Sequence, residues 1–171
     1  MQSEVQAIMA PMGIRFEWHA LDSSQESPVA VELAVITFKG ECDSRGFYPR
    51  DTNPGALGWT HISDGVILPF AVVDCGAVRG FIQRELLSLR ADVRCQAFGR
   101  ALGRVLAHEL YHIFANTKRH GAEGVGRSVY SPQDLLAPDF QFEARESTSL
   151  KTSKAHVALE IAGAASEEFE R

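Results

Sequence analysis

The stretch Val105-Leu106-Ala107-His108-Glu109-Leu110-Tyr111-His112-Ile113-Phe114 carries the pattern H-E-x-x-H inside an apolar run. The apolar residues around it recur at helical spacing and predict one long helix, capped by Asp92 and running through Ile113. Residues four positions apart lie ~40° apart around a helix axis and ~6 Å apart along it. The two histidine side chains can therefore reach one metal ion from the same face of this helix.

The residue types in this pattern fit a catalytic zinc site. Zinc accepts neutral imidazole nitrogens and, in catalytic sites, keeps three protein ligands and a water. His108 and His112 are the first two predicted ligands, and Glu109 can aim its carboxylate at the water. The metal lowers the pKa of that water toward about 7, so Glu109 is predicted to act as the general base. The same carboxylate can then return the proton to a leaving amine.

The predicted third ligand is His120, eight residues after His112. In a continued helix it would lie ~12 Å further along the axis, so the helix must end and the chain must turn back. Ala115-Asn116-Thr117 offers this break, because asparagine tolerates the left-handed conformation that ends helices. The alternatives for the third ligand are the later carboxylates Glu123, Asp139, Glu143 and Glu146. Glu143 and Glu146 would suit a ligand set completed from a later helix.

The five residues from His108 to His112, followed by a turn and His120, resemble the active-site motif of the zincin metallopeptidases. Within that family they are most similar to the metzincin-like branch, whose extended motif is H-E-x-x-H-x-x-G-x-x-H. The resemblance covers about 13 residues and the order of the elements. It implies zinc-dependent hydrolysis of peptide bonds, with three histidine ligands to Zn²⁺ and Glu109 as the general base.

The sequence departs from the family pattern at identifiable positions. Ala115 replaces the turn glycine, and Lys118 occupies the third-ligand position, so His120 requires a turn two residues longer. The methionine turn has no counterpart, because all three methionines (Met1, Met9 and Met12) come early in the chain. Peptide deformylases combine H-E-x-x-H with an upstream cysteine ligand, but the residues around Cys75 do not match their motif.

The order of elements predicts an α+β fold of the zincin-like class, with a small mixed sheet packed on the long active-site helix. Residues 1–150 are predicted to form this metallopeptidase domain, and residues 151–171 a helical or frayed C-terminal tail. The other predicted helices are 3–10, 77–90 and a short one capped by Ser131; the predicted strands are 14–18, 29–38, 57–62 and 66–73. Ser63-Asp64-Gly65 predicts a hairpin between the last two strands.

Two of these strands have predicted positions in the sheet. Residues 29–38 are nearly continuous in apolar side chains and suit a central strand. Pro69 cannot donate to a ladder, so residues 66–73 are predicted to form an edge strand. An exposed edge can hold an extended peptide as an additional strand, which makes 66–73 the predicted substrate-binding strand. Tyr130 is the first candidate for stabilising the oxyanion, with His61 and His19 as alternatives.

Composition excludes several classes of function. The chain has 171 residues and a net charge of −5, which disfavours binding to nucleic acid. No apolar run approaches the roughly 20 residues of a membrane span. Residues 1–11 lack the basic start and apolar core of a signal peptide, so we expect a soluble protein, either cytoplasmic or exported after removal of a leader. Cys42, Cys75 and Cys95 are expected to be small buried thiols, although one pair can bridge in an exported protein.

The motif leaves three interpretations of function. The first is a zinc metallopeptidase that acts on a peptide or protein substrate. The second is a non-catalytic zinc-binding homologue that binds a peptide or protein partner. The third is a purely structural cluster of histidines, which is disfavoured because a polar triplet in an apolar helix needs partners to offset its desolvation.

Overall fold

The structure is a computed structural model that describes residues 1–21, 32–43 and 55–153. It contains a three-stranded sheet of β1 (Val35–Lys39), β2 (Gly58–Ser63) and β3 (Val66–Asp74). The helices are α1 (Gln2–Met9), α2 (Cys75–Leu86), α3 (Ala91–Phe114), α4 (Pro132–Leu136) and α5 (Ala144–Lys151), with short 3₁₀ turns η1 (Ala10–Met12) and η2 (Gly124–Gly126). The expected α+β class, with a small mixed sheet and a long helix, is confirmed at this level.

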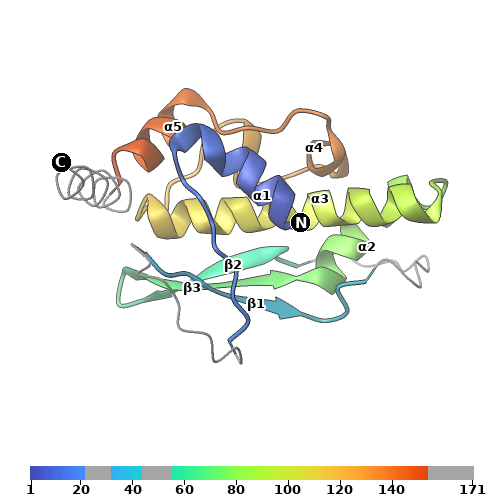
Figure 1. Ribbon diagram of the computed structural model, residues 1–171, viewed down its shortest axis with the longest axis horizontal. Coiled ribbons are helices and arrows are strands. Elements are labelled where there is room, and N and C mark those ends of the chain that lie inside the picture. The colour runs from blue at the N-terminus through green and yellow to red at the C-terminus, as the bar shows by residue number, and fades with distance from the viewer. Residues whose placement is uncertain (22–31, 44–54, 154–171) are drawn as a thin grey trace, which may run out of the picture.

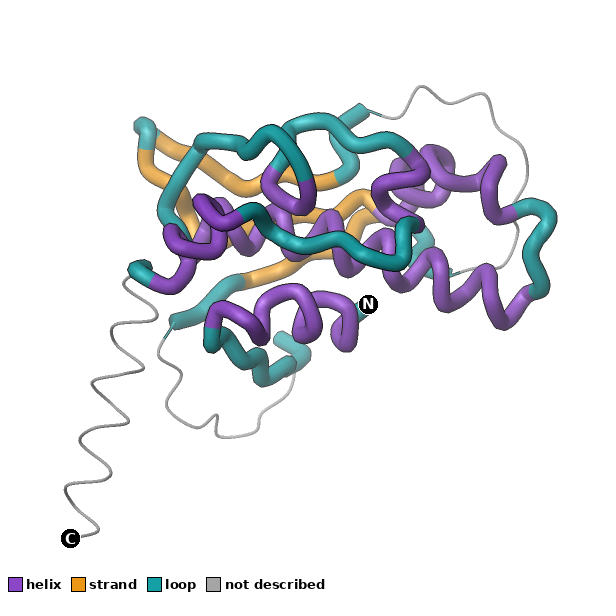
Figure 2. The backbone as a smooth tube through the Cα atoms, turned by 90° about the horizontal axis from the view of Figure 1, so that it is seen from above, coloured by secondary structure: helices purple, strands orange, loops and turns teal. Residues whose placement is uncertain are grey.

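The long helix α3 lies between two layers (Figure 1). The sheet covers one side of it, and α1, α4 and α5 cover the other, as the view from above also shows (Figure 2). Its second half, from Ala101 to Phe114, is buried at every position. A helix covered on both sides must be apolar nearly all round, so the polar residues within this half require particular partners.

The hairpin between β2 and β3 forms as predicted. Asp64 and Gly65 both have positive φ, at 49° and 83°, and Ser63 pairs with Val66 across the turn. An Asp-Gly pair supports this two-residue turn because glycine has no side chain to clash and aspartate tolerates the left-handed region.

The strand order β1-β3-β2 corrects two predictions about the sheet. The third strand, β3, is central and not at an edge: it pairs in parallel with β1 and antiparallel with β2. Pro69 is tolerated because it lies at a ladder irregularity between Thr60 and Ile62, one residue before the pairing with β1 begins at Phe70. Its missing N–H therefore removes no ladder hydrogen bond. Conversely, the strand predicted as central over 29–38 begins at Val35 and lies at an edge of the described sheet, and residues 29–31 lie outside the described ranges.

The strand predicted over 14–18 is not formed. Gln6 of α1 donates from its side-chain amide to the Ile14 carbonyl (3.2 Å) and accepts from the Phe16 N–H (3.1 Å). Ile14 is buried, and Phe16 packs on Phe114 with ring centroids 5.9 Å apart. The alternation in this segment thus reflects extended backbone lying on the core, held by one glutamine in place of a sheet.

Helix boundaries also differ in detail from the predictions. The second helix begins at Cys75, because the side chain of Asp74 accepts from the Ala77 N–H (2.9 Å) and caps it. Arg90, and not Asp92, is the N-cap residue of α3; Asp92 lies in its first turn. Ser131 caps α4 as predicted and forms a reciprocal capping box with Asp134. The predicted C-terminal tail lies outside the described residues from position 154 onward.

Two of the three cysteines form a disulfide, between Cys42 and Cys75. The third, Cys95, is a free and exposed thiol. The expectation of three small buried thiols is therefore wrong, and the bridged Cys75 offers no thiolate of the kind that a deformylase uses. None of the helices in the described ranges combines the length and hydropathy that a membrane span requires.

Candidate metal centre

His108 and His112 face each other one turn apart on α3. Their Nε2 atoms are 3.0 Å apart. The Nδ1 atom of His108 is 2.7 Å from the carbonyl oxygen of Val125, and the Nδ1 atom of His112 is 2.7 Å from that of Thr117. A carbonyl can only accept, so each neutral ring must carry its proton on Nδ1. Both Nε2 atoms therefore present lone pairs to the same small space, which is the arrangement that a bound cation satisfies.

The end of α3 positions His112. Asn116 has a φ of 45°, and its N–H donates to the Ile113 carbonyl (3.2 Å), while the Thr117 N–H donates to the His112 carbonyl (3.2 Å). These two bonds form the Schellman motif, and the predicted role of Asn116 as helix terminator is confirmed. Because Thr117 also accepts from the His112 ring, the helix end binds this residue through both its backbone and its side chain.

The chain then turns back and brings His120 to the same space. Its ring is stacked on that of His108 (centroids 5.2 Å apart, 14° between planes) and meets His112 edge-on (4.9 Å, 82°). One ring nitrogen of each histidine lies within 4.8 Å of those of the other two. The turn required by the longer spacing is therefore present, and the three predicted ligands form one group.

The segment after His120 is held by backbone bonds. The Gly121 N–H donates to the Gly126 carbonyl (2.7 Å), and the Val125 N–H donates to the Gln141 carbonyl (3.0 Å). Gly124 has a φ of 61°, and a Cβ there would collide with the Gln141 carbonyl oxygen. This tight segment fixes the Val125 carbonyl that orients His108.

The carboxylates considered as alternative ligands lie elsewhere. Glu143 accepts from the Ala122 N–H (3.3 Å), and Glu146 is buried, 2% exposed, behind the same segment. A Cβ on Gly121 would lie only 2.6 Å from Oε1 of Glu146 and 3.2 Å from Oε2 of Glu143. Within the described ranges, the group of side chains able to share one ion consists of the three histidines and includes no carboxylate.

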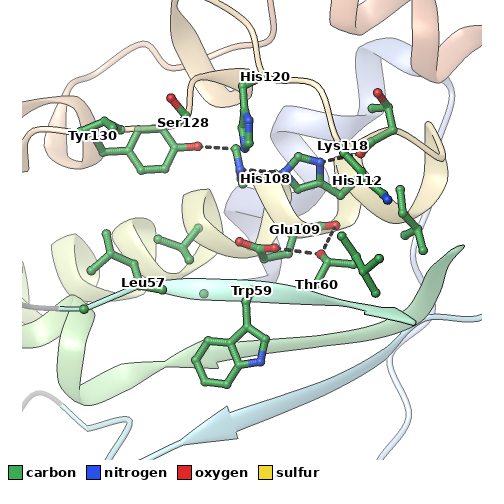
Figure 3. A pocket seen from close by; sticks show the side chains of 18 of the residues that line it. Leu57, Trp59, Thr60, His108, Glu109, His112, Lys118, His120, Ser128 and Tyr130 are labelled. Atoms are coloured by element: carbon green, nitrogen blue, oxygen red, sulfur yellow. Dashed lines mark hydrogen bonds between the residues drawn. The ribbon is translucent and has the colours of Figure 1, made fainter. Parts of the chain in front are cut away.

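Glu109 lies between the histidines and β2 (Figure 3). It is 5% exposed, and burial raises the pKa of its carboxyl to about 7, while a hydrogen bond from the Thr60 hydroxyl (2.8 Å) acts in the opposite direction. Gly58 permits this close approach, since a Cβ there would lie 2.9 Å from Val105 and 3.2 Å from Oε1 of Glu109. Sequence reasoning missed Thr60 and Gly58, and no local pattern marks them because their roles arise only when β2 packs on α3.

Burial also acts on the histidines. It lowers the pKa of His108 to about 4, an effect reinforced by repulsion from His112 and His120 and opposed by the bond to Val125. Burial lowers the pKa of His112 in the same direction, again with repulsion from His120. The rings of His108 and His112 are therefore neutral at pH 7, as metal ligands must be.

Tyr130 reaches the site from the far side of His108. Its hydroxyl is 2.8 Å from Nδ1 of His108 and donates to the same Val125 carbonyl. Burial holds the pKa of this phenol well above its ordinary value, so it stays a donor. This position supports the orientation of the His108 ring, on the side opposite to its Nε2 atom. The two alternatives to Tyr130 do not line the cleft: His61 is exposed on β2, and exposed His19 pairs with Glu17 (3.2 Å).

These groups line a cleft of about 430 Å³ between β2 and the segments that follow α3. Figure 3 shows Leu57 and Tyr130 toward one end of it, the histidines and Glu109 in the middle, and Lys118 toward the other end. Comparisons with protein-family models, curated proteins and solved structures find no match to this chain. The functional argument therefore depends on the chemistry of this cleft.

Proposed function

We propose that this protein is a zinc-dependent metallopeptidase of the zincin type. The observation that carries the proposal is the convergence of three imidazoles, two of them locked with their Nε2 lone pairs facing each other, beside a buried carboxylate in an open cleft. Nitrogen ligands with room for a water suit catalytic Zn²⁺. The long helix packed on a small sheet, with the antiparallel edge strand β2 on the Glu109 side of the histidines (Figure 3), supports the zincin-like assignment.

His108, His112 and His120 would hold the metal, which when bound supplies an acidified water and an electrophile for the substrate carbonyl. The protein's own contribution begins with Glu109, which takes a proton from the attacking water and returns it to the leaving amine. Nearby positive charge favours the ionised carboxylate and so offsets the rise in pKa that burial causes. The Thr60 hydroxyl binds the same carboxylate and fixes its direction.

The edge strand β2 is the element best placed to hold a peptide. Within the described sheet it pairs on one side only, with β3, and its residues Trp59 and Thr60 line the cleft. An extended substrate can add to the free side of such a strand by main-chain hydrogen bonds. This role was expected for residues 66–73, and the central position of β3 transfers the proposal to β2.

The proposal is tested with Glu109→Gln, which keeps the size and hydrogen-bonding capacity of the side chain but not its basicity. We expect the variant to retain one zinc per chain by metal analysis and to lose at least about 100-fold in kcat on a peptide library. His112→Ala and His120→Ala are expected to lose the zinc itself. A zinc-loaded Glu109→Gln variant that cleaves peptides as fast as the wild type would overturn the proposal.

The second candidate is a zinc-binding domain that recognises a peptide without cleaving it. The observation that favours it concerns the Tyr130 hydroxyl. This hydroxyl lies beside Nδ1 of His108 and donates its proton to the Val125 carbonyl, so in this conformation it offers no donor to an oxyanion. The same experiment separates the two functions. Wild-type protein that holds one zinc, binds library peptides and cleaves none of them would support the second.

A further inference from the structure

The cleft differs in chemistry between its two ends. Toward one end of the cleft lies Leu57 (Figure 3), and the lining as a whole also includes the apolar residues Phe81 and Val129. Ile62 and Ile67, which pair with each other beside the β2–β3 turn, line the cleft as well, and Lys118 lies toward its other end (Figure 3). A Cβ placed on Gly65 would be 3.9 Å from Nζ of this lysine, so the ammonium group lies beside the β2–β3 turn.

The backbone before Lys118 is held in place. Thr117, the preceding residue, donates its N–H to the His112 carbonyl and accepts from the His112 ring through its own carbonyl. The lysine therefore leaves the main chain immediately after a segment bound to a predicted metal ligand. The third predicted ligand, His120, follows two residues later. The side chain of Lys118 is not one of the three predicted ligands, and it lines the cleft.

The charge of Lys118 is not balanced inside the cleft. No ion pair to its ammonium group is formed by the described residues, whereas Lys39, Arg104 and Arg127 each pair with a carboxylate. The single acidic side chain of the described lining is Glu109, which binds Thr60. Among the described residues of the lining, Lys118 thus supplies a positive charge, and no carboxylate forms an ion pair with it.

We propose that Lys118 binds a carboxylate of the substrate, so that the enzyme prefers peptides with a negative charge beyond the scissile bond, toward the β2–β3 turn. The inference rests on the proposed peptidase function and names its substrate class. The carboxylate has two possible sources, the free C-terminus of a short peptide or the side chain of Asp or Glu. Ile62 and Ile67, which pair with each other beside the β2–β3 turn, line the same cleft.

The test uses zinc-loaded full-length protein and matched sets of short quenched peptides. One set carries Asp or Glu, and in parallel Asn or Gln, at each position around the scissile bond. The other set compares a free C-terminal carboxylate with a C-terminal amide. Lys118→Met, Lys118→Glu and Lys118→Arg are compared with Arg119→Met, a neighbouring exposed cation outside the cleft.

We expect wild type to favour the charged peptide of one set by about 3- to 10-fold in kcat/KM. Lys118→Met should remove this preference by raising KM for charged peptides alone, Lys118→Glu should invert it, and Lys118→Arg should restore it. The preference should shrink as salt is raised, because the pair is partly exposed. Arg119→Met should behave as wild type. The set that responds identifies the source of the carboxylate.

The inference is overturned if charged and neutral peptides are cleaved equally by wild type, or if Lys118→Met slows both to the same extent. Those outcomes leave the proposed peptidase function intact. Absence of cleavage of every peptide by protein that holds zinc removes the proposed function, and the specificity inference with it.

Discussion

Arg104 and His108 lie one helical turn apart on α3, and both are buried, yet their surroundings differ. Each of the three guanidinium nitrogens of Arg104 donates a hydrogen bond: to Glu4 (2.8 Å), to the Asp134 carbonyl (2.8 Å) and to the Ala137 carbonyl (2.7 Å). Phe140 covers the guanidinium at 4.8 Å. In the histidine group, by contrast, two Nε2 lone pairs face each other at 3.0 Å with no donor between them.

The difference separates a structural polar group from a functional one. Arg104 is satisfied by groups of its own chain and joins α1 and α4 to α3. His108 and His112 are oriented through one ring nitrogen each, and their other ring nitrogens have no donor, which is costly unless something from outside completes the site. Burial alone therefore does not identify the function of a polar side chain, whereas the balance of donors and acceptors does.

The largest effect on stability should come from removing Arg104, the buried group whose hydrogen bonds are all satisfied. Arg104→Met removes one partner of a buried ion pair and leaves two carbonyls without donors, so we expect a loss of about 3–5 kcal/mol in the free energy of unfolding. The loss should be the same with and without zinc, as measured by urea unfolding. Exposed Arg15→Met is the control. A loss below about 1 kcal/mol would show that Arg104 is not the structural counterpart of the histidine group.

At the candidate metal centre, the free energy of unfolding of the metal-free protein should instead depend on pH through Glu109. Burial raises the pKa of Glu109 from 4.5 to about 7, so the folded state keeps a proton that the unfolded state has lost. This contribution to stability is fully present below pH 4.5 and is lost as pH rises through 7. We therefore expect Glu109→Gln to gain about 2–3 kcal/mol relative to wild type between those pH values, measured by urea unfolding with a chelator.

His108 has the opposite sign but does not disturb this comparison. Burial lowers its pKa from 6.5 to about 4, so its contribution is present above pH 6.5 and is lost as pH falls through 4. The group is present in both proteins, and to first order its contribution cancels in the difference. A difference between Glu109→Gln and wild type that stays constant with pH would contradict the raised pKa of Glu109.

A smaller effect, on zinc affinity, should come from a substitution in the loop that carries His120. Gly121→Ala places a Cβ 2.6 Å from buried Glu146, so the loop or the carboxylate must shift. We expect about 1–2 kcal/mol of weaker zinc binding, measured by competition with a chelator. Gly55→Ala is the matched control, because nothing lies within 4 Å of its added Cβ. Equal zinc affinity in the two variants would show that the loop adapts freely.

The smallest effect concerns the hydrogen bond between Thr60 and Glu109. Thr60→Val removes a bond that lowers the pKa of this carboxylate, so the acid limb of the kcat/KM profile should move up by about half a pH unit. Thr60→Ser retains the hydroxyl and should keep the wild-type limb. An unchanged profile in Thr60→Val would show that the hydroxyl does not act on the base.

The sequence predicted the parts of the site that depend on local geometry. Helical spacing placed His108 and His112 together, and the left-handed tolerance of Asn116 placed the end of the helix. Features that depend on distant partners were missed or reversed. Pro69 led to the prediction of an edge strand, because the ladder irregularity that accommodates it arises only when β3 pairs with β2. The alternation after Gly13 led to the prediction of a strand, because the hydrogen bonds from Gln6 that hold this segment cannot be read from its pattern.

The disulfide between Cys42 and Cys75, at a sequence separation of 33, closes a covalent ring that contains both β2 and β3. A single backbone nick inside that ring would leave the two fragments attached to each other through sulfur. The strand that borders the cleft would then stay tethered to α2, whose Phe81 lines the same cleft. On a denaturing gel such a nicked molecule would migrate as one species until a reductant is added.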